Sequence, residues 1–135
     1  MPTALEIVTP ERLLLSRPVD MVVVPAAEGE LGVLPGHAPM IVLLRGGVLR
    51  IFEGGQETSK MFVSGGFAEV TPERCTVLAS EVMPLAEVSK SAAEARVKQA
   101  EAAYAAVDKT DITARDATLD HLQSARAMAS IAEAP

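Results

Sequence analysis

Short runs of apolar residues recur along the first 84 residues, and several of them alternate with polar positions. In Val48 to Glu53, for example, successive side chains would point to opposite faces of a strand. Turn-forming residues separate the runs and fit β-hairpins. Runs at this spacing predict two packed antiparallel sheets, a β-sandwich, and not a parallel sheet with crossover helices. The turns are Gly46-Gly47, Gly54-Gly55, Gly65-Gly66 and Thr71-Pro72-Glu73.

The chain changes character near residue 86, because after Pro84 neither Gly nor Pro recurs before the last residue. The segment Ser91-Ala92-Ala93-Glu94 has the form of a capping box, which predicts that a helix begins there. Thr113 followed by Asp116 marks a second, weaker helix start. We predict a β-sandwich domain over residues 1–86 and an antiparallel two-helix hairpin over residues 87–135.

An apolar stripe at steps of four and three residues would join the two helices. Because Ala buries little area, we expect this hairpin to be held together weakly. The stripe consists of Ala93, Val97, Ala100, Tyr104 and Val107, followed by Leu119, Leu122, Ala125 and Ala129.

The composition excludes several classes of function. The 135 residues carry a formal net charge of −6 and no cluster of Lys and Arg, which argues against a nucleic-acid partner. One Tyr, three Phe and no Trp argue against a base-stacking platform. The single cysteine, Cys75, is expected to be a half-buried strand residue, and a lone cysteine fits a reducing compartment.

No membrane span or secretory signal is expected. The N-terminal residues have neither the basic region nor the apolar region of a signal peptide. The longest uncharged stretch, Leu31 to Leu44, has 14 residues and two prolines, which is too short to cross a bilayer. Membrane association would therefore come through a partner.

The segment EGELGVLPGHAP, residues 28–39, concentrates the unusual residues. It does not fit a phosphate-binding loop, because Pro35 and Pro39 lack the backbone N–H and no helix pattern follows. His37 has the chemistry of a general base or a metal ligand, but the other histidine, His121, lies far along the chain. We predict no metal site here.

Glu28 and Glu30 flank a glycine and would point the same way in an extended chain, as paired catalytic carboxylates do. No set of polar partners accompanies them, so we predict no catalytic residue and no cofactor. Two interpretations of the segment remain open. It is a rigid surface that presents Leu31, Val33 and Leu34 to a partner, or a loop folded onto its own core.

The string VPAAEGELGVLPGHAP, residues 24–39, closely resembles a motif of the epsilon subunit of rotary F-type ATP synthases, called delta in mitochondria. LEIVTPER near the start, GGVLRI at residues 46–51 and FVSGGFAEVTPERCTVLA at residues 62–79 agree in the same order. The resemblance implies a sandwich of about ten strands followed by a helical hairpin. It implies a non-catalytic rotor subunit of the central stalk that binds the gamma subunit and the c-ring, at the cytoplasmic face of a bacterial inner membrane.

The resemblance also assigns residues by position. The segment from Gly29 through Glu30, Leu31 and Gly32 matches the loop that meets the c-ring, and Glu30 is the best candidate for direct contact. His37, Ala38 and Pro39 match the neighbouring part of the same surface, near gamma and the ring.

The hairpin departs from the family in two ways. At the start of the first helix, Arg96 matches the arginine of a motif associated with ATP binding, but Ala93 replaces its aspartate, which weakens the prediction of a nucleotide contact at Arg96. On the second helix, two arginines are balanced by two aspartates over residues 113–131, so docking on the catalytic alpha/beta head would be weak. We therefore expect a poor inhibitor of ATP hydrolysis. The alternatives are a nucleotide-sensing module and, less well supported, a stand-alone enzyme using His37.

Overall fold

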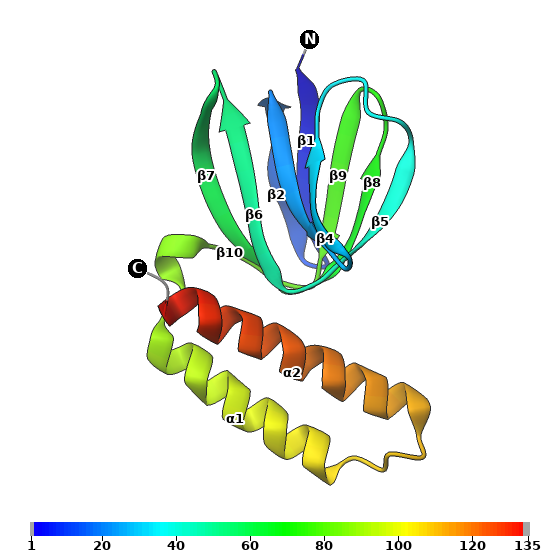
Figure 1. Ribbon diagram of the computed structural model, residues 1–135, viewed down its shortest axis with the longest axis vertical. Helices are drawn as coiled ribbons and strands as arrows, with labels where there is room; N and C mark the ends of the chain where they lie inside the picture. The colour runs from blue at the N-terminus through cyan, green and yellow to red at the C-terminus, as the bar shows by residue number, and fades with distance from the viewer. Residues whose placement is uncertain (1, 134–135) are drawn as a thin grey trace. The chain divides into compact units, whose positions relative to one another are not determined.

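The computed structural model describes residues 2–133 and divides into two compact units. The first unit extends to Leu85, and its described residues form ten strands (Figure 1). A short 3-10 turn, η1 (Leu85–Glu87), follows the last strand. The strands are β1 Thr3–Thr9, β2 Arg12–Val19, β3 Met21–Ala26, β4 Gly29–Val33, β5 Met40–Leu44, β6 Gly47–Glu53, β7 Gln56–Val63, β8 Gly66–Val70, β9 Arg74–Ala79 and β10 Val82–Pro84.

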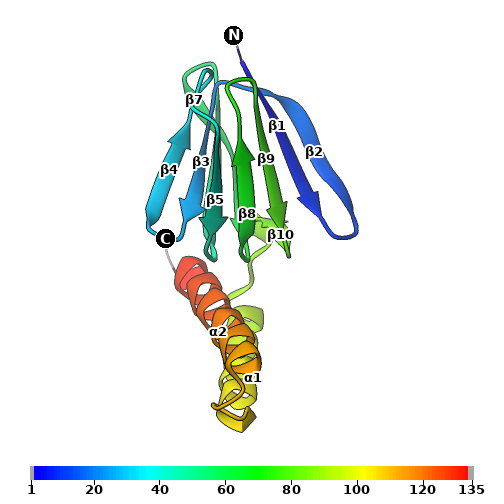
Figure 2. The ribbon, with the colours of Figure 1, turned by 90° about the vertical axis from the view of Figure 1, so that its right-hand side faces the viewer.

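The strands are hydrogen-bonded in the order β10-β7-β6-β3-β5-β8-β9-β1-β2, and β4 pairs with β3. Strands β3 and β5 share a single residue pair, Ala26 with Leu44, so the sheet folds over at this point. Two layers result, with β4, β3, β6, β7 and β10 in one and β5, β8, β9, β1 and β2 in the other (Figure 2). The predicted β-sandwich followed by helices is confirmed.

One strand pair differs from the antiparallel expectation, because β1 and β9 run parallel. A tight turn forces two successive strands to be antiparallel, but seven strands separate β1 from β9 along the chain. Their relative direction is therefore set by the closure of the layer and not by a local turn.

The core lies between the two layers and is built from aliphatic side chains at alternate positions. On β9, for example, Cys75, Val77 and Ala79 are buried while the residues between them are not. Cys75 is fully buried, not half-buried as expected, because it shares the core-facing register of Val77. The largest buried side chains of this core are Leu5, Ile7, Val19, Val22, Val24, Val33, Leu49, Ile51, Val63, Val70 and Val77.

The glycine pairs have two different roles. Gly54-Gly55 forms the β6–β7 hairpin, and the Thr71 to Glu73 turn joins the antiparallel pair β8–β9, as predicted. The hairpins predicted at Gly46-Gly47 and Gly65-Gly66 are wrong, because β5 is not paired with β6 and β7 is not paired with β8. These glycines instead permit close approach. A Cβ at Gly47 would lie 2.8 Å from the Pro25 Cβ, and one at Gly66 would lie 2.0 Å from the Leu78 carbonyl oxygen.

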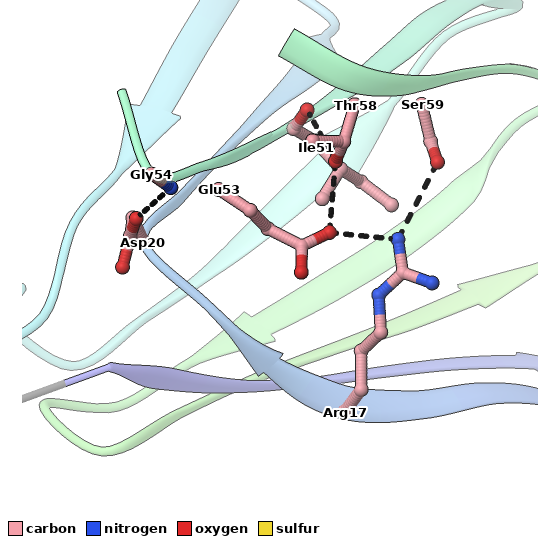
Figure 3. Close-up of polar contacts among 7 residues, drawn as sticks. All are labelled: Arg17, Asp20, Ile51, Glu53, Gly54, Thr58 and Ser59. Carbon is pink, nitrogen blue, oxygen red and sulfur yellow. Dashed lines mark hydrogen bonds and ion pairs between the residues drawn. The ribbon is translucent and has the colours of Figure 1, made fainter. Parts of the chain in front are cut away.

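A polar cluster connects β2 to the β6–β7 hairpin, where no strand ladder joins them (Figure 3). Arg17 Nη2 donates to Glu53 Oε1 at 2.9 Å and to Ser59 Oγ at 3.4 Å. Thr58 Oγ1 donates to the same Glu53 oxygen at 2.8 Å, and the Gly54 N–H donates to Asp20 Oδ2. We name this set, Arg17, Asp20, Glu53, Gly54, Thr58 and Ser59, the seam cluster.

The second unit contains two helices, α1 (Lys90–Ala106) and α2 (Ile112–Glu133), joined by a short loop. Within α1 Ala93 is buried and Val97, Ala100 and Tyr104 are half-buried while the other residues are exposed, which confirms the predicted stripe. On α2 the buried side chains are Leu122, Ala125 and Met128. Met128 was missed because the expected stripe passed through Ala129 instead.

Both predicted helix starts are wrong by two residues. Ser89, not Ser91, is the N-cap of α1, because its extended backbone places its hydroxyl to accept the Ala92 N–H. Asp111, not Thr113, caps α2, with its Oδ1 accepting the Ala114 N–H at 3.1 Å. In each case the residue that precedes the first helical turn offers the better-placed oxygen.

The loop between the helices is closed by local contacts. Lys109 Nζ donates to the carbonyl oxygens of Tyr104 and Val107 at the end of α1, and it lies 4.3 Å from the centre of the Tyr104 ring. Asp108 Oδ1 accepts from the Thr110 N–H and hydroxyl at 2.9 and 2.7 Å. These bonds lower the pKa of Asp108, and the bond from the Thr110 hydroxyl is the largest cause.

Candidate functional site

Glu30, the first candidate residue, is the second residue of β4 and directly follows the β3–β4 turn. Gly29 adopts φ +138°, a backbone conformation that side chains disfavour, and this lets the chain reverse into β4. The neighbouring β5–β6 connection supports the turn. The Ala27 N–H donates to the Leu43 carbonyl at 2.8 Å, and Arg45 Nε donates to the Ala26 carbonyl at 3.1 Å. The turn is therefore held by residues 43–45.

The Glu30 carboxylate is paired with an arginine that the sequence analysis did not single out. Arg50 Nη2, on β6, donates to Glu30 Oε2 at 3.1 Å, with side chains 35% and 52% exposed respectively. The two residues lie on strands at either side of β3. Alternation along β6 could have placed Arg50 on an outward face, but no sequence pattern gives the lateral order of strands.

The candidate loop after β4 is tied down by backbone hydrogen bonds. The Gly36 N–H donates to the Pro72 carbonyl at 2.8 Å, and the His37 N–H donates to the Leu34 carbonyl at 3.1 Å. His37 Nδ1 donates to the Ala38 carbonyl oxygen at 2.8 Å, so this ring nitrogen is occupied within the loop. Ala38 and Pro39 are exposed.

The candidate residues fall into two groups, one on β4 and one in the loop that follows it. Glu30, Leu31 and Gly32 lie on the strand itself, whereas His37, Ala38 and Pro39 follow its far end. Five residues of strand span about 16 Å. Glu30 is therefore near the opposite end of this strand from the loop with His37, Ala38 and Pro39, whereas Gly32 directly precedes the last strand residue.

The expectation that Leu31, Val33 and Leu34 present a common apolar surface is wrong for two of them. Val33 is fully buried, and Leu31 packs against the core. Only Leu34, with 54% of its surface exposed, remains available. The alternation of β4 turns its odd-numbered residues inward, so the segment is in part a surface and in part core.

A second surface emerges from the β5–β8 pair, and the sequence analysis did not find it. Ile41 and Leu43 on β5 are 72% and 67% exposed, and Phe67 on β8, paired with Leu43, is 43% exposed. The row continues over β9 to Leu78, over β1 to Val8 and over β2 to Leu13. We name these six residues, Val8, Leu13, Ile41, Leu43, Phe67 and Leu78, the apolar face. The signal was the run MIVLL, which is apolar at every position instead of every second one.

Within residues 2–133 no group of three or more His, Cys, Asp or Glu side chains is placed to hold a metal ion. Arg96 lies exposed on α1, whereas Ala93, three residues earlier, is fully buried. Burial raises the pKa of the Cys75 thiol to about 11, which opposes formation of a thiolate nucleophile. In the same range no helix is both long and apolar enough to cross a bilayer.

Comparison with known proteins matches both the sequence and the fold. A family model described as "ATP synthase, Delta/Epsilon chain, beta-sandwich domain" matches residues 3–85. The ATP synthase epsilon chain of Granulibacter bethesdensis is 65% identical over 130 residues, which are 96% of each chain. The ATP synthase epsilon chain of Gluconacetobacter diazotrophicus is 44% identical over 135 residues, covering 100% of this chain and 96% of the relative.

Solved structures agree. A chain in the Euglena gracilis mitochondrial ATP synthase (OSCP/F1/c-ring, rotational state 1) superposes with a TM-score of 0.74 and 25% identity, covering 96% of this chain and 80% of that one. A chain in the Tetrahymena thermophila mitochondrial ATP synthase central stalk/c-ring superposes with a TM-score of 0.67 and 13% identity, covering 98% of this chain and 97% of that one. At this identity the likeness is one of fold alone. The resemblance inferred from the motifs is confirmed, and the chain belongs to the ATP synthase delta/epsilon chain family.

Proposed function

We propose that the chain is a non-catalytic central-stalk subunit of a proton-translocating F-type ATP synthase, binding gamma and the c-ring and coupling rotation to ATP synthesis. Family membership supports the complex, and the solved relatives come from assemblies described as containing a c-ring or central stalk. The observation that carries the proposal is the exposed apolar face. As a peripheral subunit, the chain reaches the cytoplasmic side of a bacterial inner membrane through these partners.

The apolar face is the proposed gamma-binding surface. Its three residues on β5 and β8, Ile41, Leu43 and Phe67, would gain roughly 4 kcal/mol if a partner covered them, scaling full burial of each side chain by its exposed fraction. A contiguous apolar surface of this kind on a soluble domain marks a protein interface. The loop with His37, Ala38 and Pro39 directly precedes β5 and would extend that interface.

The experiment is isothermal titration of purified gamma with the full-length chain and two variants. Leu43→Asp places a charge in the centre of the apolar face, and we expect binding weakened about 30- to 150-fold, equal to roughly 2–3 kcal/mol. Ile112→Asp is the matched control, because Ile112 is 62% exposed but lies on the hairpin. Unchanged binding by Leu43→Asp, or no binding by the unaltered chain, would contradict the proposal.

The β3–β4 turn end, with Glu30 exposed on it, is the proposed c-ring contact. Reversing its charge with Glu30→Lys should loosen coupling, and Glu101→Lys, an equal charge reversal at an exposed position of α1, is the control. Inverted membrane vesicles report this as proton-driven ATP synthesis divided by ATP hydrolysis. Normal coupling and c-ring association in Glu30→Lys would count against this assignment.

The hairpin is proposed to inhibit ATP hydrolysis only weakly, since α2 offers no net positive charge to the alpha/beta head. Deleting residues 88–135 should change the hydrolysis rate by less than about twofold, and strong activation would overturn this proposal. Nucleotide sensing through Arg96 has no supporting cluster, because Ala93 provides no carboxylate. Thermal shift with millimolar ATP should show no stabilisation.

A further inference from the structure

We propose that Arg50 is a positioning residue for Glu30, so that the c-ring is met by an Arg50–Glu30 pair and not by a free carboxylate. This inference rests on the proposed function. The contact between Arg50 Nη2 and Glu30 Oε2 is 3.1 Å long, and it joins strands that are not themselves hydrogen-bonded to each other.

The register of the sheet explains why the two side chains can meet. Val23 on β3 is paired with Gly32 on β4 and with Arg50 on β6, so all three share one face. Glu30, two residues before Gly32, lies on the same face. Gly32 has no side chain there, and an added Cβ would have only the Met21 sulfur within 4 Å, at 3.8 Å. The absence of a side chain at position 32 leaves the space across β3 open for Arg50.

Arg50 is itself restrained. Its guanidinium carbon lies 5.8 Å from the centre of the Phe52 ring, within the range of a cation–π contact. Lys60 is paired with Arg50 across β6 and β7 but binds Glu57 instead, at 3.5 Å. Among residues 2–133, Arg50 is therefore the cation that pairs with Glu30, and it approaches from β6.

The pairing defines what the docking partner must offer. Arg50 occupies Oε2 of Glu30, while Oε1 has no hydrogen-bond partner within the described part of the chain. A carboxylate oxygen is an acceptor only, so the partner must present an N–H or O–H donor to Oε1. Holding the carboxylate in one orientation before contact reduces the side-chain entropy lost on binding.

The test measures binding of the full-length chain to a purified gamma–c-ring assembly in detergent by biolayer interferometry. We expect Glu30→Gln to weaken binding about tenfold. We expect Arg50→Gln to weaken it about three- to fivefold, and Arg50→Lys to restore part of that loss. In the double variant, Arg50→Gln should add nothing to Glu30→Gln, because the arginine acts only through the carboxylate. Arg17→Gln is the matched control, since it breaks the Arg17–Glu53 ion pair of the seam cluster.

A second measurement needs no partner. Side-chain carbon relaxation by NMR on the isolated chain should show Glu30 more mobile in Arg50→Gln and unchanged in Arg17→Gln. The inference is overturned if the mobility of Glu30 is the same in Arg50→Gln as in the unaltered chain. It is also overturned if Arg50→Gln weakens binding to the same extent with and without Glu30→Gln. If the unaltered chain fails to bind the assembly at all, the proposed function fails first. If it binds and Glu30→Gln weakens binding while Arg50→Gln does not, only this inference fails.

Discussion

Substituting Gly66 by Ala should destabilise the sandwich more than the matched substitution Gly29→Ala does. Gly66 begins β8 with φ +130°, and its added Cβ would lie 2.0 Å from the Leu78 carbonyl oxygen and 3.0 Å from the Ala79 Cα. All of these neighbours are backbone, so no side-chain rotation relieves the overlap. Gly29→Ala is the control, because Gly29 has a similar φ of +138° and nothing within 4 Å.

The difference between the two variants isolates the overlap from backbone strain. Strain at positive φ costs about 1–2 kcal/mol in each variant. Moving the carbonyl by more than an ångström disturbs the β8–β9 ladder at Gly66 and Ala79, which adds about 2–3 kcal/mol. For a domain of this size the extra loss lowers the melting temperature by roughly 10–20 °C relative to Gly29→Ala. Scanning calorimetry measures this, and melting temperatures within 3 °C of each other, on the order of 0.5 kcal/mol, would refute the reasoning.

Three further predictions concern Cys75, Asp111 and Glu53. The Cys75 thiol, with its pKa raised from 9.0 to about 11, should resist labelling at pH 8 until urea is added. The contribution of the neutral thiol to the free energy of unfolding is fully present below pH 9 and is lost as pH rises toward 11. Urea titrations of the unaltered chain and of Cys75→Ala, each at pH 8 and pH 10.5, measure this loss. Asp111→Ala removes the α2 cap and should cost about 1 kcal/mol of hairpin stability, seen as earlier thermal loss of the circular dichroism at 222 nm. Glu53→Gln should cost at most about 1 kcal/mol but hasten amide exchange in the β6–β7 hairpin, and unchanged exchange would remove the seam cluster's role.

The parts of the fold that were predictable from sequence are those set by local periodicity. The alternation of apolar and polar residues predicted the strand runs, and the steps of three and four residues between Ala93 and Tyr104 predicted the stripe of α1. Helix starts were displaced by two residues, because several residues near each boundary can cap and only the backbone geometry chooses among them.

The parts that were not predictable depend on residues distant in the chain. Gly47 looks like a hairpin glycine, but the need for it comes from Pro25, on a strand that happens to lie beside it. Arg50 reaches Glu30 only because β3 is placed between β4 and β6. The order of strands across a sheet cannot be read from a single sequence. The apolar face and the Arg50–Glu30 pair were therefore found only once the strand order and register were known.

The parallel pairing of β1 with β9 has a consequence for synthesis on the ribosome. The amino-terminal β1–β2 hairpin emerges first, yet its place in the layer is created by residues 74–78, near the end of the domain. Until those residues leave the exit tunnel no other strand can hydrogen-bond to the hairpin, and closing so long a loop is slow. We expect the nascent sandwich to stay sensitive to protease until nearly its whole length is outside, and then to become resistant in one step.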